Sequence, residues 1–181
     1  MTLMPKSHPN SLAGIRVFIA NEQTAHPVDE QKIAAAIETV VKDSAFTSAS
    51  ISVAIVDDAT MHQLNRQYLE HDYPTDVLSF VLDANDAHLE GEVIISADTA
   101  ATCAREYGWS AAAEQLLYAI HGTLHLVGLN DKSPDEARQM RMEEAKYLRL
   151  FGFEPVFTEK LQDVEEARSD SSSIRGGALS Q

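Results

Sequence analysis

The chain has 181 residues, of which 14 are basic and 28 acidic, giving a formal net charge of -14; 44% of the residues are hydrophobic. This composition fits one globular domain and argues against a broad basic surface for nucleic acid. No apolar run is long enough for a membrane span, and the N-terminus lacks the basic-then-apolar pattern of a signal peptide, so we expect a cytoplasmic protein. The single cysteine, Cys103, excludes an intrachain disulfide and a thiolate zinc cluster.

Composition divides the chain into three segments. Residues 1–13 form a polar leader, residues 14–155 hold almost all of the apolar periodicity, and residues 156–181 form a polar, Ser- and Gly-rich tail that is too poor in apolar groups to fold alone. The tail does not account for the acidity. From Glu154 onward there are three basic and six acidic residues, so the body keeps a charge of -11.

The first half of the body predicts strands mixed with helices. Alternating apolar residues indicate strands over residues 14–21 and 51–55, and helical spacing predicts a helix over residues 29–42. Asp57 or Asp58 can cap a following helix. Residues 75–83 are nearly continuously apolar, which is typical of a central strand covered on both faces, and an acidic loop over residues 83–90 leads to a fourth strand at residues 91–96.

The second half predicts helices alone. The pattern favours helices over residues 97–107 and 110–126, ended by Gly108 and near Gly128. Ser133-Pro134-Asp135-Glu136 then reads as a capping box with proline at the first helical position. We therefore expect an α+β domain, with a small four-stranded mixed sheet, helices packed on it and a metal site on a late helix.

Residues 121 to 131 hold the pattern with the clearest chemistry. His121 and His125 are one helical turn apart, so their rings share a face and can meet one ion. Asp131 follows a turn at Gly128 that would swing a third ligand back toward the pair. Two imidazoles and a carboxylate, with one position open for water, are typical of a catalytic zinc ion, and we expect one Zn²⁺ per chain.

The spacing alone is also compatible with two histidines that share a partly buried helix by chance. However, residues 116–129 are otherwise almost wholly apolar or small, and unpartnered imidazoles are costly to bury there. Gly122, which costs about 1 kcal/mol against Ala inside a helix, indicates a close approach to the backbone. It also occupies the position of the general base in the H-E-x-x-H zinc peptidases, which disfavours that mechanism.

Two separate motifs carry a family resemblance. The stretch His121-Gly122-Thr123-Leu124-His125-Leu126-Val127-Gly128, with Met140 downstream, and the stretch Tyr73-Pro74-Thr75-Asp76-Val77-Leu78-Ser79-Phe80, followed by Gly91-Glu92-Val93, resemble the YbeY family of bacterial rRNA-maturation endoribonucleases. The resemblance spans roughly residues 14 to 152. It implies the family's α+β fold and a metal-dependent endoribonuclease that prefers single strands and acts in 16S rRNA 3′-end maturation and ribosome quality control.

The sequence departs from the family's usual pattern at two positions. Asp131 stands where the family has a third histidine ligand, and this carboxylate lowers the charge of the site by one and makes a bound water less acidic. Leu69 stands where the family has an arginine, which removes an expected phosphate contact. Arg66 is a weak candidate for the missing cation, and Asp76 and Ser79, polar within an apolar stretch, are further candidates for substrate binding.

Three functions follow from these observations. The first is the endoribonuclease, with rRNA and the small ribosomal subunit as partners and neither DNA nor a membrane. The second is a ribosome-assembly factor that keeps the fold and the metal but has little nuclease activity, which both departures favour. The third is a zinc hydrolase of another substrate. A cation near the metal, able to stabilise phosphate charge, separates the first from the second.

Overall fold

The computed structural model describes residues 6–7, 14–69 and 75–156. Most of the predicted leader and tail, together with Tyr73 and Pro74, lie outside the described residues, so the three-segment division stays a prediction. In the described part no helix is both long and apolar enough to cross a bilayer. The elements are β1 (Lys6–Ser7), β2 (Ile15–Asn21), α1 (Glu30–Lys42), β3 (Ser48–Val56), α2 (Asp58–Leu69), β4 (Val77–Ala84), β5 (His88–Ser96), α3 (Ala97–Tyr107), α4 (Ala111–Leu126) and α5 (Pro134–Leu150).

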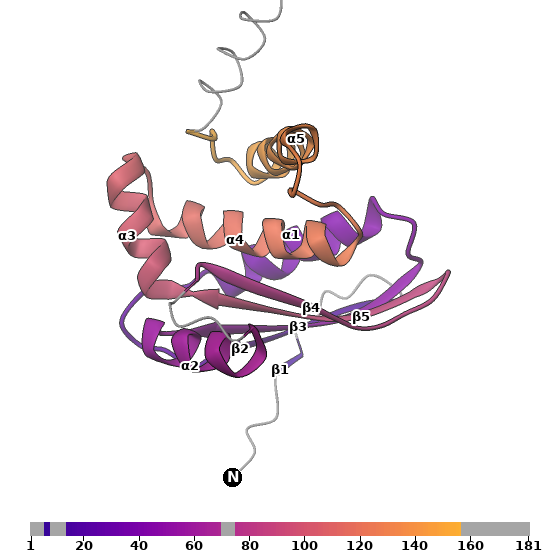
Figure 1. Cartoon of the computed structure of the whole chain (residues 1–181), viewed down its shortest axis with the longest axis horizontal. Helices are drawn as coiled ribbons and strands as arrows, with labels where there is room; N and C mark the ends of the chain where they lie inside the picture. Colours follow the sequence, from indigo (N-terminus) through magenta and orange to yellow (C-terminus); the bar gives the residue numbers. More distant parts are fainter. Residues whose placement is uncertain (1–5, 8–13, 70–74, 157–181) are drawn as a thin grey trace, which may run out of the picture.

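One mixed sheet organises the molecule (Figure 1). Its strand order is β1-β2-β3-β5-β4, with β2, β3 and β5 parallel and the two edge strands antiparallel to their neighbours. The four predicted strands and the α+β class are confirmed, and the two-residue β1 adds a short edge. The alternation of buried and exposed residues along β2 gives it one face against the helices.

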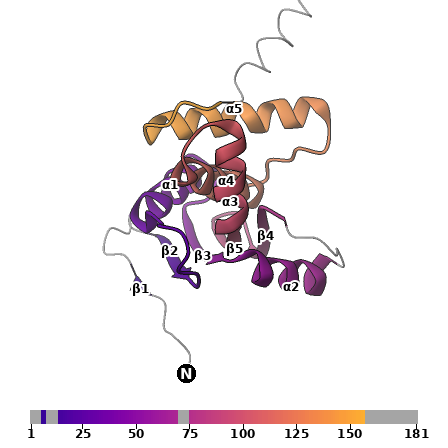
Figure 2. The same cartoon turned by 90° about the vertical axis from the view of Figure 1, so that its left-hand side faces the viewer.

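The helices form layers on the sheet. Figure 1 shows α2 below the sheet, α1 and α4 above it, and α5 above α4; Figure 2 shows α5 lying across the top of the molecule. The main core lies between the sheet and the upper helices. A smaller cluster, built on Val56, Met61, Leu78 and Ile94, lies between α2 and the sheet.

The prediction that residues 75–83 form a central strand is wrong. Among the described strands, β4 lies at the edge of the sheet and pairs with β5 alone. Both faces of β4 are covered at its start, because Val77 faces α4 while Leu78 joins the cluster between α2 and the sheet. This accounts for the apolar residues there. Farther along, Val81 and Leu82 are 53% and 59% exposed. The acidic loop is also shorter than predicted, because Asp83 and Ala84 pair with Glu90 and Leu89.

Both helices that carry the site begin at a capping serine, and the capping box predicted for α5 is confirmed. The Ser110 hydroxyl accepts a hydrogen bond from the Ala113 amide at the start of α4. Ser133 and Glu136 form the reciprocal capping box of α5, with Pro134 in its first turn. Of the two candidate caps of α2, the side chain of Asp57 accepts the Thr60 amide at 2.7 Å. These caps fix where α4 and α5 begin, and therefore which residues face each other across the gap between them.

Candidate metal centre

The two histidines lie near the C-terminal end of α4, on the same face. Their side chains are 24% and 27% exposed. α4 packs closely on the sheet because Gly122 lacks a side chain: a Cβ there would lie 2.8 Å from a methyl of Val93 and 3.2 Å from one of Val77. The close approach expected from this glycine is therefore an approach of helix to sheet, and it positions the turn of α4 that carries His121 and His125.

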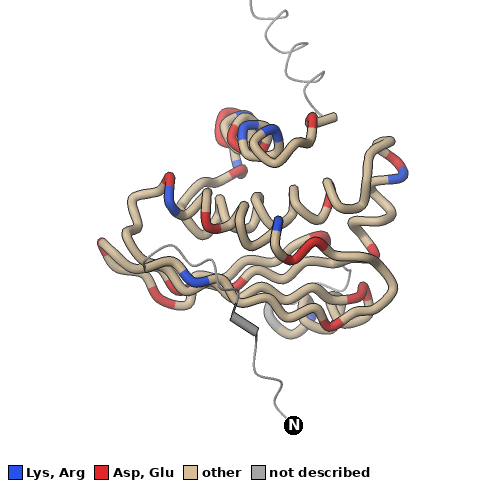
Figure 3. The backbone as a smooth tube through the Cα atoms, turned by 180° about the vertical axis from the view of Figure 1, so that it is seen from behind, with Lys and Arg blue, Asp and Glu red and all other residues tan. Residues whose placement is uncertain are grey.

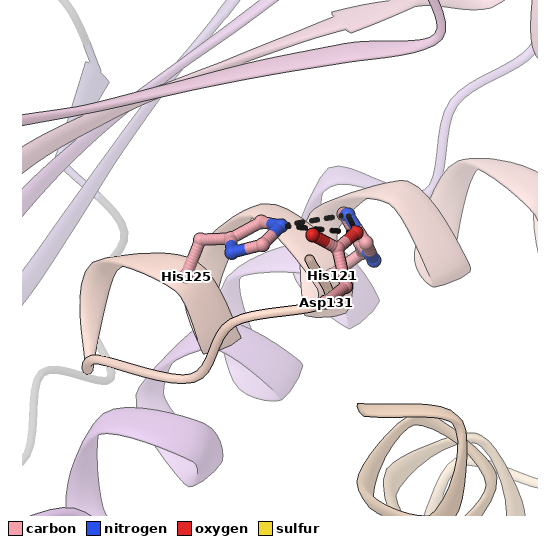
Figure 4. A group of neighbouring side chains, drawn as sticks. All are labelled: His121, His125 and Asp131. Carbon is pink, nitrogen blue, oxygen red and sulfur yellow. Dashed lines mark hydrogen bonds and ion pairs between the residues drawn. The ribbon is translucent and has the colours of Figure 1, made fainter. Parts of the chain in front are cut away.

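The third side chain returns to the histidines because the helix ends in a tight turn. Gly128 has a φ of 101°, in the left-handed region that glycine adopts without strain. The Leu129 amide donates to the Leu124 carbonyl at 3.0 Å, which closes the turn. Asp131 then points back toward both rings, as Figure 4 shows. The side chain of Asp131 is 43% exposed, so the group lies open to solvent on one side.

The three ligand atoms form a compact triangle. The Nε2 atoms of His121 and His125 are 3.0 Å apart, and Oδ2 of Asp131 lies 3.9 Å from the first and 3.7 Å from the second. A point equidistant from all three lies about 2.1 Å from each, close to the usual zinc–nitrogen and zinc–oxygen distances. The described residues that could hold a metal ion together are these three. Their chemistry and spacing fit a divalent ion.

Both imidazoles are oriented through their other nitrogen. Nδ1 of His121 lies 2.6 Å from Oε1 of Glu144 on α5, whose side chain is 8% exposed. Nδ1 of His125 lies 2.9 Å from the Leu129 carbonyl oxygen. Since both partners only accept, Nδ1 carries the proton in each ring and the Nε2 lone pairs face each other. This is the arrangement that ligating histidines need.

Acidic groups set the electrostatics of the site. Burial alone would lower the pKa of His121, but the hydrogen bond and the charge of Glu144, together with the charges of Asp76 and Asp131, raise it. Without an ion, His121 therefore holds a proton more readily than an ordinary imidazole does, because its pKa is raised. A bound cation would replace that proton as the partner of three carboxylates.

The predicted substrate residues lie at different distances from this centre. Asp76 precedes β4 and acts electrostatically on His121, and its Oδ1 accepts the Val77 amide at 3.0 Å. Ser79 is half-buried on β4, on the strand face that Val77 turns toward α4. Arg66 is exposed near the end of α2, which covers the opposite face of the sheet (Figure 1). The side chain of Leu69 lies outside the described residues.

The sequence reasoning missed Glu144 as a partner of the metal centre. It lies far along the chain from His121, and only the packing of α5 on α4 brings the two together. The signal was present, because Glu144 occupies the apolar stripe of α5 between Met140 and Tyr147, where an unpartnered acid would be costly.

Comparison with known proteins places the chain in a family. A family model described as Endoribonuclease YbeY matches residues 18–152. The chain belongs to this family. The matched stretch contains all three candidate ligands and Glu144, so the whole metal centre lies within the YbeY domain.

Individual YbeY relatives agree with this assignment. The chain is 42% identical over 137 residues to Endoribonuclease YbeY of Rhodopirellula baltica, covering 72% of this chain and 71% of that protein. It is 35% identical over 153 residues to Endoribonuclease YbeY of Salinibacter ruber, covering 80% and 94%. The solution structure of TM1509 from Thermotoga maritima superposes with a TM-score of 0.54 at 25% identity, covering 91% of this chain and 99% of that one.

Proposed function

We propose that this chain is a zinc-dependent endoribonuclease that cleaves single-stranded RNA in 16S rRNA 3′-end maturation and ribosome quality control. The observation that carries the proposal is the triangle of His121, His125 and Asp131 in a member of the YbeY endoribonuclease family. Three protein ligands leave one position of a tetrahedral zinc site for water or substrate, as in catalytic rather than structural sites.

In this proposal each residue of the centre has a separate task. His121, His125 and Asp131 would hold the ion, while Glu144 and the Leu129 carbonyl keep the two imidazoles in the ligating tautomer. When bound, the zinc ion would supply Lewis-acid polarisation of a phosphodiester oxygen and activation of a water nucleophile. Asp76, whose charge acts on His121, and Ser79, half-buried on β4, would contact the substrate.

The charge of the protein bears on its partners. Acidic positions outnumber basic ones along the backbone (Figure 3), and the whole chain carries -14. A polyanion approaching the metal centre is therefore repelled over most of the surface. We propose that the substrate is presented within the small ribosomal subunit in the cytoplasm, where additional contacts offset this repulsion.

The direct test joins metal content to cleavage. The purified protein should contain about one zinc ion per chain and cut a single-stranded RNA oligonucleotide from the 3′ region of 16S rRNA faster than the same sequence in a duplex. His121→Ala and His125→Ala should lose both zinc and cleavage, whereas Glu106→Gln, on the exposed face of α3, should lose neither. Cleavage that persists in both zinc-free histidine variants would refute the proposal.

One observation favours the assembly-factor alternative. Among the described residues, the ion pairs of His121, His125 and Asp131 join these three to one another and to Glu144, so none of these pairs brings a lysine or arginine to the site to stabilise phosphate charge. The alternative predicts that His121→Ala supports small-subunit assembly as well as the native chain does. The endoribonuclease predicts that unprocessed 16S rRNA accumulates in that variant.

A further inference from the structure

A cavity separate from the metal centre is lined by none of the three candidate ligands. It has a volume of about 260 Å³ and opens between the end of α1, the end of α4 and one face of α5. Val40, Leu124, Val127 and Leu129 contribute apolar side chains to its lining. Leu129 links the cavity to the metal centre, because it lines the cavity while its carbonyl oxygen accepts a hydrogen bond from Nδ1 of His125.

Polar groups on one side of the cavity form a connected set. Nζ of Lys146 lies 3.5 Å from Oδ2 of Asp43 and 3.1 Å from Oε2 of Glu143. The Tyr147 hydroxyl donates to Oδ2 of Asp43 at 3.1 Å. Burial alone would lower the pKa of Lys146, but its hydrogen bonds to Tyr147 and Glu143 raise it, so the ammonium stays charged. Two carboxylates and one ammonium give the rim a formal charge of -1.

The unused acceptors on this rim indicate what the cavity can bind. Within the described part of the chain, Oδ1 of Asp43 and Oε1 of Glu143 accept no hydrogen bond. Gln139, also on the lining, adds an exposed side-chain amide. The ammonium of Lys146 is already shared between the two acids, so it offers little to an anion. A ligand with several N–H donors and an apolar stem would satisfy both the carboxylate oxygens and the apolar wall.

We propose that this cavity is a recognition site for the arginine side chain of a basic partner protein. The planar guanidinium has five donors in a fork that can reach two carboxylates at once, which a lysine ammonium does less well. The cavity is smaller than the roughly 300–1,000 Å³ of pockets for drug-sized ligands, which suits one side chain rather than a nucleotide. The strongly acidic chain also attracts basic proteins.

The test uses the full-length, zinc-loaded protein with its leucine and valine methyl groups labelled for NMR. Butylguanidinium, which reproduces the arginine side chain, should shift the methyl signals of Leu124, Val127 and Leu129 saturably. Butylammonium should bind several-fold more weakly. Butyrate should leave these signals unchanged. A capped Gly-Arg-Gly peptide should bind at the same methyls, because the proposed source is a protein.

Variants locate the binding and decide the outcome. Glu143→Gln and Asp43→Asn should each weaken butylguanidinium binding about tenfold, the loss expected for one charge-assisted hydrogen bond. Gln139→Trp, at an exposed rim position, should block the cavity, whereas Glu106→Gln on α3 should change nothing. Equal binding of butyrate, shifts confined to other methyls, or unchanged affinity in both carboxylate variants would overturn the site. If butylguanidinium binds but the Gly-Arg-Gly peptide does not, the assignment of the cavity to a protein partner is overturned.

Discussion

Asp131 is the candidate ligand that departs from the three-histidine pattern, and its role can be measured. We expect Asp131→Ala to lose most of its zinc, because two imidazoles alone hold the ion weakly. Asp131→His should keep about one zinc per chain, since an imidazole nitrogen binds zinc at nearly the same distance as a carboxylate oxygen. The zinc-to-protein ratio after dialysis against a weak chelator measures both.

The competing role for Asp131 is support of the start of α5. The structure assigns that task elsewhere, because Ser133 and Glu136 cap α5 through bonds of 2.9 and 3.3 Å. If Asp131→Ala nevertheless kept all its zinc, Asp131 would be an exposed acid without a role in metal binding.

Glu144 fixes the orientation of His121 from the neighbouring helix, and its charge can be removed with little change of volume. Glu144→Gln should weaken zinc affinity by about 10–100-fold, the usual cost of losing such a partner of a ligating histidine. Competition with a zinc-binding dye measures the affinity. Asp135→Asn, an exposed substitution on the same helix, is the control. Equal affinities in native and Glu144→Gln protein would contradict the assigned role.

Glu114 is a buried acid in the first turn of α4. Burial raises its pKa, against the opposing hydrogen bonds from Trp109 and Tyr118. A folded-state carboxyl pKa above the ordinary value means that the folded protein binds the proton more tightly. This contribution to stability is therefore present at low pH and is lost as pH rises from about 4.5 through the raised pKa.

Replacement of Glu114 by glutamine should remove this pH dependence, because the amide does not ionise. Relative to the native chain, Glu114→Gln should gain stability as pH rises from about 4 to 8, measured from urea unfolding midpoints at each pH. Comparing the two proteins cancels the titration of His121, which both contain. A stability difference that is constant with pH would show that Glu114 does not titrate in this range.

At the scale of elements, the contact of α4 with β5 depends on Gly122. Alanine normally favours a helix by about 1 kcal/mol over glycine. Here its methyl would lie 2.8 Å from Val93, a β-branched side chain with little freedom to move. We expect Gly122→Ala to lower the free energy of unfolding by about 1–3 kcal/mol, measured by chemical denaturation.

The double variant Gly122→Ala with Val93→Ala tests this explanation. Its free energy of unfolding should fall by less than the sum of the losses in the two single variants, because the second substitution makes room for the added methyl. If the two effects simply add, the clash is not the cause of the destabilisation.

Local patterns predict the elements better than they predict the arrangement of those elements. The capping box at Ser133 and the helix stop at Gly108 depend on neighbouring residues, and both are found as expected. The place of β4 depends on its pairing partners. Coverage of Val77 and Leu78 by helices on opposite faces produces the same apolar run as a central strand would, so the pattern could not tell edge from centre.

The same limit applies to the metal centre. The sequence predicts that the three candidate ligands converge, because they share one helix and the turn that follows it. The sequence marked Glu144 as an acid within an apolar stripe but could not identify His121 as its partner, because that contact depends on how α5 packs on α4. Arg66 was a candidate for the missing cation, but it lies on α2, and the sheet separates α2 from α4 (Figure 1).

The charge of the whole molecule predicts how the free protein meets RNA. With a net charge of -14, it releases few counterions from a nucleic acid. We expect binding to naked single-stranded RNA weaker than about 10⁻⁴ M at physiological salt, with useful affinity appearing only on small ribosomal subunits. Fluorescence anisotropy across a salt series measures this. Tight, strongly salt-dependent binding to arbitrary RNA would count against presentation by the ribosome.

The candidate ligands all lie between residues 121 and 131, and this closeness has a consequence for the apoprotein. Closing so short a loop costs little chain entropy, so an ion bound there would order a short segment rather than the whole domain. The two apolar clusters of the core include none of these side chains, so the packing of the sheet is formed without an ion. A bound ion would therefore connect the end of α4 to the segment that leads into α5. We therefore expect the apoprotein to remain folded, which circular dichroism with and without a chelator would measure.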